Sequence, residues 1–177
     1  MQASVTHVAD ETIDAAMDAE LRGLLTTCFI GPHDDVFRTR RYFREPYRNR
    51  WIIRNDRGVL VAHAGVHEKR VEADGRIYLI GGVAEVCVHP AYRGRGYVRL
   101  LMQALDEWMA SRGFHFAVLF GRREVYESSG YVQVQDLTHD AVENGKPAGR
   151  KSVTAMVKPL GATPWPLGPV HLPGPTF

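Results

Sequence analysis

The most constraining feature of this sequence is a strand pattern that passes through a glycine-rich turn into a helix pattern. Residues 86–99 read VCVHPAYRGRGYVR. Val86 and Val88 alternate with Cys87 and a histidine, which predicts a strand with one apolar face. Pro90 ends this strand because proline offers no N–H to a neighbouring strand. The helix pattern that follows leaves only a short turn between the two elements.

This turn has the composition of a phosphate-binding loop. Its two glycines let a ligand approach the backbone closely, and the first N–H groups of a helix have no partner within the helix. Two arginines add positive charge, so the turn suits a pyrophosphate, although a helix start with surface arginines and no ligand has the same composition. The turn comprises Arg93, Gly94, Arg95, Gly96, Tyr97 and Val98, and apolar residues recur at helical spacing at Val98, Leu101, Met102, Leu105, Trp108 and Met109.

Strand, turn and helix together resemble the acyl-CoA-binding core of the GNAT superfamily of N-acetyltransferases. The pyrophosphate motif of that family is Arg or Gln, two residues, Gly, one residue, then Gly or Ala, and it falls on Arg93, Gly96 and Val98. Val98 departs from this motif, and a valine there is similar to the aminoglycoside 2′-N-acetyltransferase branch. The resemblance implies an α/β fold with a mixed, mostly antiparallel sheet. One parallel strand pair would splay apart to admit acyl-CoA, and helices would cover both faces.

The resemblance also implies a cosubstrate and a reaction. We expect acetyl-CoA to give its acetyl group directly to a primary amine of a small molecule. Backbone N–H groups around Val86, Cys87 and Val88 would bind the oxyanion that develops on the thioester. We do not expect Cys87 to be acylated, because nothing near it in the sequence supplies a base to form its thiolate.

Two side chains are candidates for proton transfer. The segment LFGRREVYESSGY at 119–131 resembles the short helix of the family that carries a tyrosine before a Gly-aromatic pair, and that tyrosine is Tyr126. Its phenol would protonate the departing thiolate, although a core tyrosine that only packs is the alternative. Glu85 is the carboxylate nearest in sequence to the expected acetyl site and is the candidate base. A water chain, or no dedicated base, is equally compatible with the sequence. Arg122 and Arg123 replace the asparagine that many family members carry in this loop.

Composition limits the other classes of function. The chain has 177 residues and a net charge of +2, which predicts one domain, 1–177, with its own core and no strong attraction to nucleic acid. Cys28 and Cys87 lie in apolar surroundings without metal-ligand spacing, so we expect buried free thiols, no metal and a reducing cytoplasm. No apolar run approaches the roughly 18 residues of a membrane span, so we expect no membrane partner. The oligomeric state, including a homodimer, stays open.

The rest of the chain divides into strands and helices by its periodicity and its turn residues. We expect Asp10 or Thr12 to cap the first helix, and Gly81 with Gly82 to mark a bulge or a close approach in a bent strand. The expected elements are strand 4–9, a helix up to Cys28, strands 50–55, 59–71 and 76–89, the helix after Gly96, strand 114–120, a short helix within 121–129, strand 132–136, a polar loop at 144–149 and strand 151–157.

The connection at 29–49 is rich in arginine and aromatic side chains. Such a segment suits a lid or an RNA-binding surface, but arginines also cover apolar surface with their stems, and we favour this structural interpretation. The alternative function is an acyl-CoA-binding regulatory or RNA-interacting module without turnover, and a longer acyl chain is the alternative within enzymes. The arginines are Arg38, Arg40, Arg41, Arg44 and Arg48, with Arg50 just beyond.

Residues 159–177 form a proline-rich tail. The tail reads PLGATPWPLGPVHLPGPTF, with six prolines and apolar residues that predict an extended, docked segment. It resembles the terminal segment of aminoglycoside 2′-N-acetyltransferases and, together with the hairpin GVLVAHAGVHEKRV at 58–71, the nodulation acyltransferases. These similarities imply an aminoglycoside-like or amino-sugar acceptor.

Overall fold

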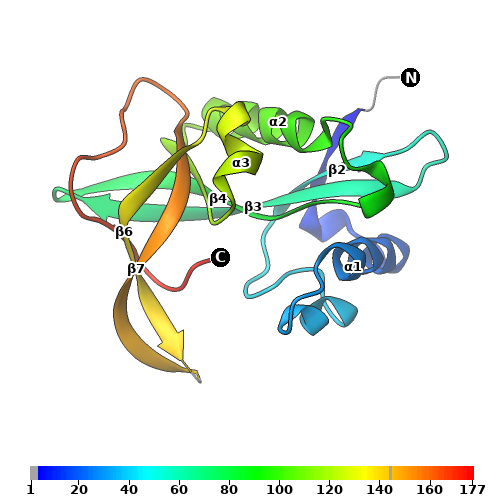
Figure 1. Ribbon diagram of the computed structural model, residues 1–177, viewed down its shortest axis with the longest axis horizontal. Coiled ribbons are helices and arrows are strands. Elements are labelled where there is room, and N and C mark those ends of the chain that lie inside the picture. The colour runs from blue at the N-terminus through cyan, green and yellow to red at the C-terminus, as the bar shows by residue number, and fades with distance from the viewer. Residues whose placement is uncertain (1–3, 144) are drawn as a thin grey trace. The chain divides into compact units, whose positions relative to one another are not determined.

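The computed structural model describes residues 4–143 and 145–177. The chain divides into two compact units: unit 1 comprises the chain up to His67 and residues 83–105, and unit 2 comprises residues 68–82 and 106–177. Strands β3 (Leu60–Ala73) and β4 (Arg76–Val88) and helix α2 (Tyr97–Ser111) contribute residues to both units (Figure 1).

Unit 1 pairs its strands in antiparallel fashion. Strand β1 (Val5–Ala9) pairs with β2 (Asn49–Arg54), and β2 pairs with the first part of β3. The N–H of His89 donates to the carbonyl of Val61 at 2.8 Å, which ties the end of β4 to β3. The helical elements of this unit are the 3₁₀ turns η1 (Asp10–Thr12), η2 (Asp34–Arg38) and η3 (Pro90–Tyr92), helix α1 (Ala15–Cys28), and the start of α2.

The cap of helix α1 corrects one sequence prediction. Neither Asp10 nor Thr12 caps this helix, because both lie in the preceding 3₁₀ turn. The cap is Asp14, whose carboxylate accepts from the N–H of Met17 at 2.8 Å. Asp10 is instead the partner of two arginines, and such contacts between residues far apart in the sequence cannot be seen in a capping pattern.

Unit 2 contains two parallel strand pairs, one of them formed by β4. Strand β5 (Phe116–Leu119) runs parallel to β4 over the pairs Ile80–Phe116 to Gly82–Val118, and this pairing stops while β4 continues to Val88. Strand β5 is buried throughout, as its apolar run predicts. The other elements of the unit are α3 (Arg123–Tyr126), η4 (Glu127–Ser129), β6 (Val132–Glu143), β7 (Lys146–Pro159) and β8 (Val170–Leu172). The mixed α/β fold with parallel and antiparallel strands confirms the expected fold class, although β6 and β8 form a second parallel pair that the sequence did not predict.

Strands β6 and β7 are longer than predicted. They form an antiparallel ribbon (Figure 1), so the residues expected as a polar loop at 144–149 belong largely to β7, and Asn144 lies outside the described residues. The outer part of this ribbon pairs opposite charges, Arg150 with Asp140 and Lys151 with Glu143. A ribbon that is open to solvent needs ladder hydrogen bonds and complementary charges rather than apolar alternation. The polar composition was therefore a poor guide to its structure.

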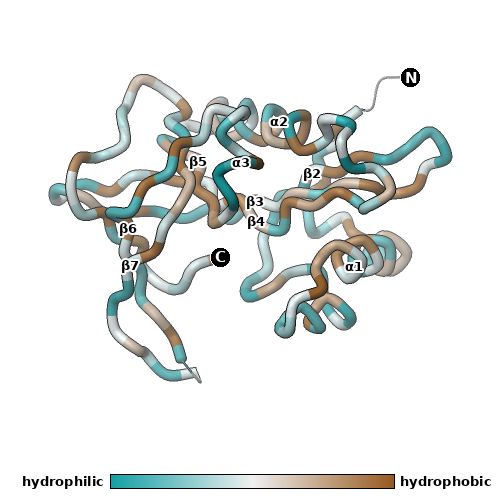
Figure 2. The backbone as a smooth tube through the Cα atoms, in the orientation of Figure 1, coloured by the Kyte–Doolittle hydropathy of each residue, from teal (hydrophilic) through white to brown (hydrophobic). Residues whose placement is uncertain are grey.

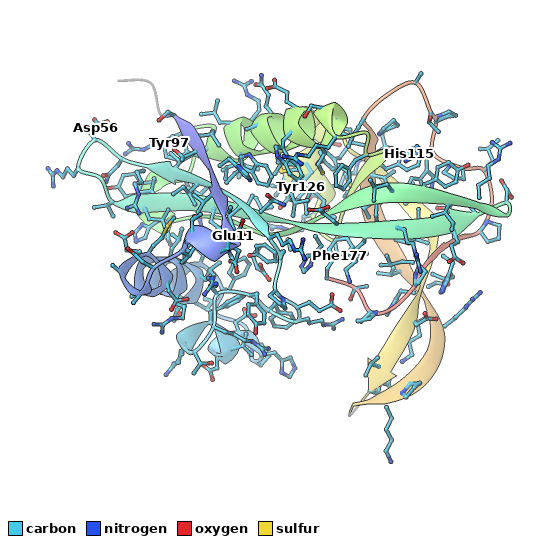
Figure 3. All side chains as sticks on the ribbon, turned by 180° about the vertical axis from the view of Figure 1, so that it is seen from behind. Glu11, Asp56, Tyr97, His115, Tyr126 and Phe177 are labelled. Carbon is cyan, nitrogen blue, oxygen red and sulfur yellow. The ribbon has the colours of Figure 1, made fainter. Side chains whose placement is uncertain are left out.

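The tail adds a strand to unit 2. Strand β8 pairs with β6 and with β3, and Val170 and Leu172 are fully buried. The ring of Trp165 meets Phe116 edge-on at 5.0 Å. The ring of Phe177 lies against Gly82 of β4, where a Cβ atom would come within 2.7 Å of it (Figure 3). Of the two predictions for the glycine pair in β4, the close approach is the one that the structure confirms.

Candidate functional site

The turn before α2 has the backbone geometry that its glycines predict. Gly94 and Gly96 both adopt a φ of 76°, a left-handed conformation that strains other residues. The first helical hydrogen bond runs from the N–H of Leu100 to the carbonyl of Gly96 at 3.1 Å. The N–H groups of residues 97–99 precede that bond and are available at the helix N-terminus, where Tyr97 is located (Figure 3). The turn therefore presents backbone donors and no side chain at its two glycines.

The arginines of this turn are exposed but ordered. Arg93 donates from Nε to the carbonyl of Val88 at 3.3 Å. The guanidinium of Arg95 lies over the ring of Tyr92 at 5.0 Å, and the hydroxyl of Tyr92 accepts from Asn55 at 2.8 Å. These contacts hold two positive charges next to the helix N-terminus, which raises its attraction for an anion.

The strand that leads into the turn carries the remaining candidates of unit 1. Glu85 adopts a φ of 47°, rare for a residue with a side chain, and this marks the irregular point of β4. Val86 follows it and is half-buried, while Cys87 and Val88 are buried. The structure therefore keeps Glu85, the strand residues and the turn in one continuous segment of unit 1.

The carboxyl group of Glu85 is held by the connection at 29–49. The N–H of Phe43 donates to Glu85 Oε1 at 2.8 Å, and Tyr47 hydrogen-bonds to the same carboxyl group. Burial raises the pKa of Glu85 above its ordinary value, and the hydrogen bonds from Tyr47 and Phe43 and the charge of Arg50 oppose that increase only in part. Glu85 is thus a carboxylate with increased proton affinity.

A buried polar network surrounds Glu85 in unit 1, and the sequence analysis missed it. Arg50 is fully buried, and its Nε donates to Asp10 Oδ1 at 2.8 Å. Its Nη1 donates to the hydroxyl of Tyr47 at 2.9 Å and faces Nε2 of His63 at 3.3 Å. Nδ1 of His63 lies 2.9 Å from the backbone carbonyl of Glu85. We refer to these five residues as the Arg50 network.

Two sequence signals belong to this network. Arg50 lies beside the apolar residues of a predicted strand, and Gly65 interrupts the strand opposite. A Cβ atom at Gly65 would lie 2.1 Å from the ring of Tyr47, so this glycine makes room for the tyrosine. Neither signal identifies the partner, because Tyr47 and Gly65 are far apart in the sequence.

The two cysteines contact each other and remain free thiols. Cys28 ends α1, and its side chain hydrogen-bonds to that of Cys87. This contact lowers the pKa of Cys28, whereas the same contact and burial raise the pKa of Cys87 well above its usual range. Cys87 is therefore held as a thiol, which disfavours its use as a nucleophile.

Tyr126 lies in unit 2, at the end of helix α3. The start of this helix is hydrophilic (Figure 2), and the tyrosine itself is half-buried. Its ring covers Gly121, where a Cβ atom would come within 2.5 Å of it, and packs 6.3 Å from the ring of Tyr131. The hydroxyl of Tyr131 donates to Asp106 at 2.7 Å, and Lys158 also donates to Asp106 at 2.7 Å. The ring of Tyr126 therefore has a packing role in unit 2.

Three arginines of the 29–49 connection have protein partners. Arg41 pairs with Asp10 at 2.8 Å and with Asp18 at 2.9 Å. Arg38 pairs with Asp35 at 3.0 Å, and Arg40 donates to the carbonyl of Phe43. These contacts agree with the structural interpretation of the segment and weaken the case for an RNA-binding surface.

Residues 4–143 and 145–177 were compared with the requirements of two further classes of site, a metal centre and a membrane span. No group of three or more His, Cys, Asp or Glu side chains in this part of the chain is placed to hold a metal ion. Within the same residues, no helix combines the length and the apolar character that a membrane crossing requires.

Comparisons with known proteins identify the class of domain. A family model described as an acetyltransferase (GNAT) domain matches residues 10–134. A search of curated proteins found no match. Among solved structures, the chain is similar to the GNAT family N-acetyltransferase YhbS from Escherichia coli in complex with CoA, with 16% identity, a TM-score of 0.64, and coverage of 97% of this chain and 89% of that one.

Two other solved structures give a similar picture. A GNAT family acetyltransferase from Brucella melitensis in complex with acetyl-CoA has 17% identity and a TM-score of 0.58, over 96% of both chains. The ribosomal-protein-S18-alanine N-acetyltransferase from Escherichia coli has 17% identity and a TM-score of 0.55, over 93% of this chain and 99% of that one. At these identities the solved structures establish the fold alone.

Proposed function

Because the chain belongs to the GNAT acetyltransferase family and is an acetyl-CoA-dependent acyltransferase, we propose that it acetylates a primary amine of a small molecule by direct transfer. The observation that carries this proposal is the turn at 93–98. Its glycine conformations, its helix N-terminus and its exposed arginines fit the pyrophosphate of CoA. The CoA and acetyl-CoA complexes of the similar solved structures support the same ligand class here.

Direct transfer needs a neutral amine, a bound oxyanion and a protonated leaving group. The amine nitrogen bonds to the acetyl carbon, the C–S bond breaks, the amine loses one proton and the CoA thiolate gains one. We assign oxyanion binding to backbone N–H groups around Val86, Cys87 and Val88. The raised pKa of Cys87 supports direct transfer over an acyl-cysteine intermediate.

We assign the base to Glu85 and the acid to Tyr126. The raised pKa of Glu85 is closer to working pH than that of an ordinary glutamate, which favours a role as general base. A tyrosine phenol, with a usual pKa of about 10, can protonate a thiolate whose conjugate acid has a pKa of about 8.5 with little cost. Tyr126→Phe keeps the ring over Gly121 and removes only the hydroxyl, so it separates an acid role from a packing role. We expect turnover to fall about 10²-fold with acetyl-CoA affinity unchanged.

We propose an amino sugar or aminoglycoside-like molecule as the acceptor, on the basis of Val98 and the proline-rich tail. A screen with acetyl-CoA would include amino sugars, aminoglycosides, polyamines and amino acids, and free CoA would be detected by chromatography so that the protein thiols do not interfere. Turnover of amino sugars above the other amines would support this class. Turnover with other amines only would contradict the acceptor assignment and leave the acetyltransferase role intact.

The assignment of the phosphate turn is tested by a matched pair at one glycine. Asp and Asn both tolerate the left-handed conformation of Gly96 better than other side chains, and they differ only in charge. We expect Gly96→Asp to weaken acetyl-CoA binding at least about tenfold more than Gly96→Asn, because only Asp repels the pyrophosphate. Calorimetric titration of both variants measures this difference. Equal affinities of two folded variants would contradict the assignment.

Binding without turnover of any amine would instead favour the regulatory acyl-CoA-binding module. The RNA-interacting alternative has less support, because Arg41 and Arg50 are engaged in ion pairs with Asp10. The calorimetric titration described for Gly96, repeated on the unmodified protein with longer acyl-CoA molecules, would show which acyl chain length binds.

A further inference from the structure

Donor chemistry sets the directions of the hydrogen bonds in the Arg50 network, in which Nη1 of Arg50 shares its two protons among the Tyr47 hydroxyl, the Arg41 carbonyl and Nε2 of His63. A guanidinium can only donate, so the hydroxyl of Tyr47 accepts from Arg50 and its own proton is free to point at another acceptor. That acceptor is the carboxyl group of Glu85, to which Tyr47 hydrogen-bonds. The backbone carbonyl of Glu85 can only accept, so Nδ1 of His63 carries a proton and Nε2 accepts from Arg50. Arg50 thereby sets the orientation of both neighbours of Glu85.

Arg50 is itself fixed. Its guanidinium is fully buried, bonded to Asp10 and stacked 4.2 Å from the centre of the ring of Tyr47. Asp10 pairs with Arg50 at 2.8 Å and compensates its positive charge, and it also holds Arg41, which has Asp18 as a second partner. A buried ion pair of this kind is weak evidence for stability, but it holds one geometry. The network therefore holds the Tyr47 hydroxyl in one position, although Tyr47 lies in a loop.

One oxygen of Glu85 remains available. Oε1 accepts from the N–H of Phe43, whereas Oε2 is buried and, among the described residues, receives no hydrogen bond. A buried carboxylate oxygen without a donor is costly unless a water or a substrate group supplies one. Oε2 therefore has an unused acceptor site, which an amine proton would fill directly or through a relaying water.

We infer that Tyr47, anchored by Arg50, is a positioning residue for the Glu85 base: it orients the carboxyl group so that Oε2 is the atom that accepts the proton. This inference rests on the proposed function for the identity of the reaction. The titratable and charged groups that face Glu85 are Tyr47 from the 29–49 connection, Arg50 from β2, His63 from β3 and Cys87 on β4 itself.

The first test reads Glu85 directly and needs no acceptor. The full chain is labelled with ¹³C at the carboxyl carbon of glutamate, and each variant is titrated by NMR, with Glu85→Gln identifying the resonance. We expect Tyr47→Phe to move the titration of Glu85 to higher pH, because it removes a hydrogen bond that favours the charged form. Its ring still fills the space beside Gly65, so the packing is kept. Tyr42→Phe, which removes a hydroxyl from the same connection outside the network, should leave the titration unchanged.

The second test displaces Tyr47 without changing it. A Cβ atom in Gly65→Ala would lie 2.1 Å from the tyrosine ring, so the ring must shift from the position in which it meets Arg50 and Glu85. We expect the same upward direction as in Tyr47→Phe. With an amine found in the screen, the acidic limb of the kcat/KM profile should move to higher pH in Tyr47→Phe. Activity should fall about tenfold on the acidic side and recover at higher pH. A purely structural role would lower activity equally at every pH.

The outcomes separate the two proposals. An unchanged Glu85 titration in a folded Tyr47→Phe variant overturns the positioning role of Tyr47, even if the enzyme acetylates amines. Full turnover in Glu85→Gln overturns the assignment of the base in the proposed function, even if the titration of Glu85 in the Tyr47→Phe variant shifts.

Discussion

The two units bury different kinds of side chain. Unit 1 encloses Arg50 and His63 beside an apolar cluster under α1, whereas the cluster of unit 2 around β5 and β8 is aliphatic and aromatic, and the buried Asp106 of unit 2 lies outside that cluster. Buried charged groups fix the directions of hydrogen bonds, but their contribution to stability changes when a group gains or loses a proton. Apolar packing does not depend on pH, but it depends on every segment that contributes side chains to the core. We therefore expect titration of His63 to act on unit 1, and loss of a packed segment to act mainly on unit 2.

Removal of residues 165–177 should give the largest effect. Val170 and Leu172 are fully buried and Trp165 packs on the same cluster, so their loss opens a large cavity. Each such deletion costs about 2–5 kcal/mol, and the sum is comparable to the whole stability of a domain. We expect cooperative melting of unit 2 to be lost in calorimetry, with fast hydrogen exchange in β5 and β7. Unchanged melting would show that the tail only covers the core.

The stability of unit 1 should depend on pH through His63. Burial beside Arg50 lowers the pKa of His63 to about 3, below the usual value of about 6.5. Between these values the unfolded chain binds the proton and the folded chain does not, so stability falls as the pH falls. From pH 7 to pH 5 this loss is about 2 kcal/mol.

Denaturant unfolding at both pH values measures this loss. His63→Gln should remove that part of the pH dependence, while His33→Gln, a substitution of an exposed histidine in the same unit, should retain it. The same slope in wild type and in His63→Gln would show that another group controls the acid response.

A smaller effect tests the packing of the tail on β4. Gly82→Ala places a Cβ atom within 2.7 Å of the Phe177 ring, and we expect a cost of about 1 kcal/mol. The cost should nearly disappear in a Phe177→Ala background, which a double-mutant cycle by thermal melting measures. Gly161→Ala is the matched control, because nothing lies within 4 Å of its Cβ position. Equal costs in both backgrounds would place the strain elsewhere.

Individual elements show which structural features the sequence could predict and which it could not. The conformation of the turn at 93–98 was predicted because its signal is local: glycine is required at positive φ, and helical periodicity places the turn at the start of α2. The all-apolar run of β5 was predicted because a strand buried on both faces leaves a continuous pattern. The β6–β7 ribbon was predicted too short, because a solvated ribbon carries no apolar pattern.

The sequence by itself determined the family, the mixed α/β class and the strand, turn and helix start within residues 85–98, since all of these depend on neighbouring residues and their spacing. Only the tertiary structure decided what Arg50, Tyr47 and His63 do. The residues of the network lie on a loop, a 3₁₀ turn and three strands, and whether an arginine is a solvated surface charge or a buried anchor depends on contacts that no local pattern encodes. The physical reason is that a buried hydrogen-bond direction is set by every donor and acceptor around it, and the fold brings these together from distant parts of the chain.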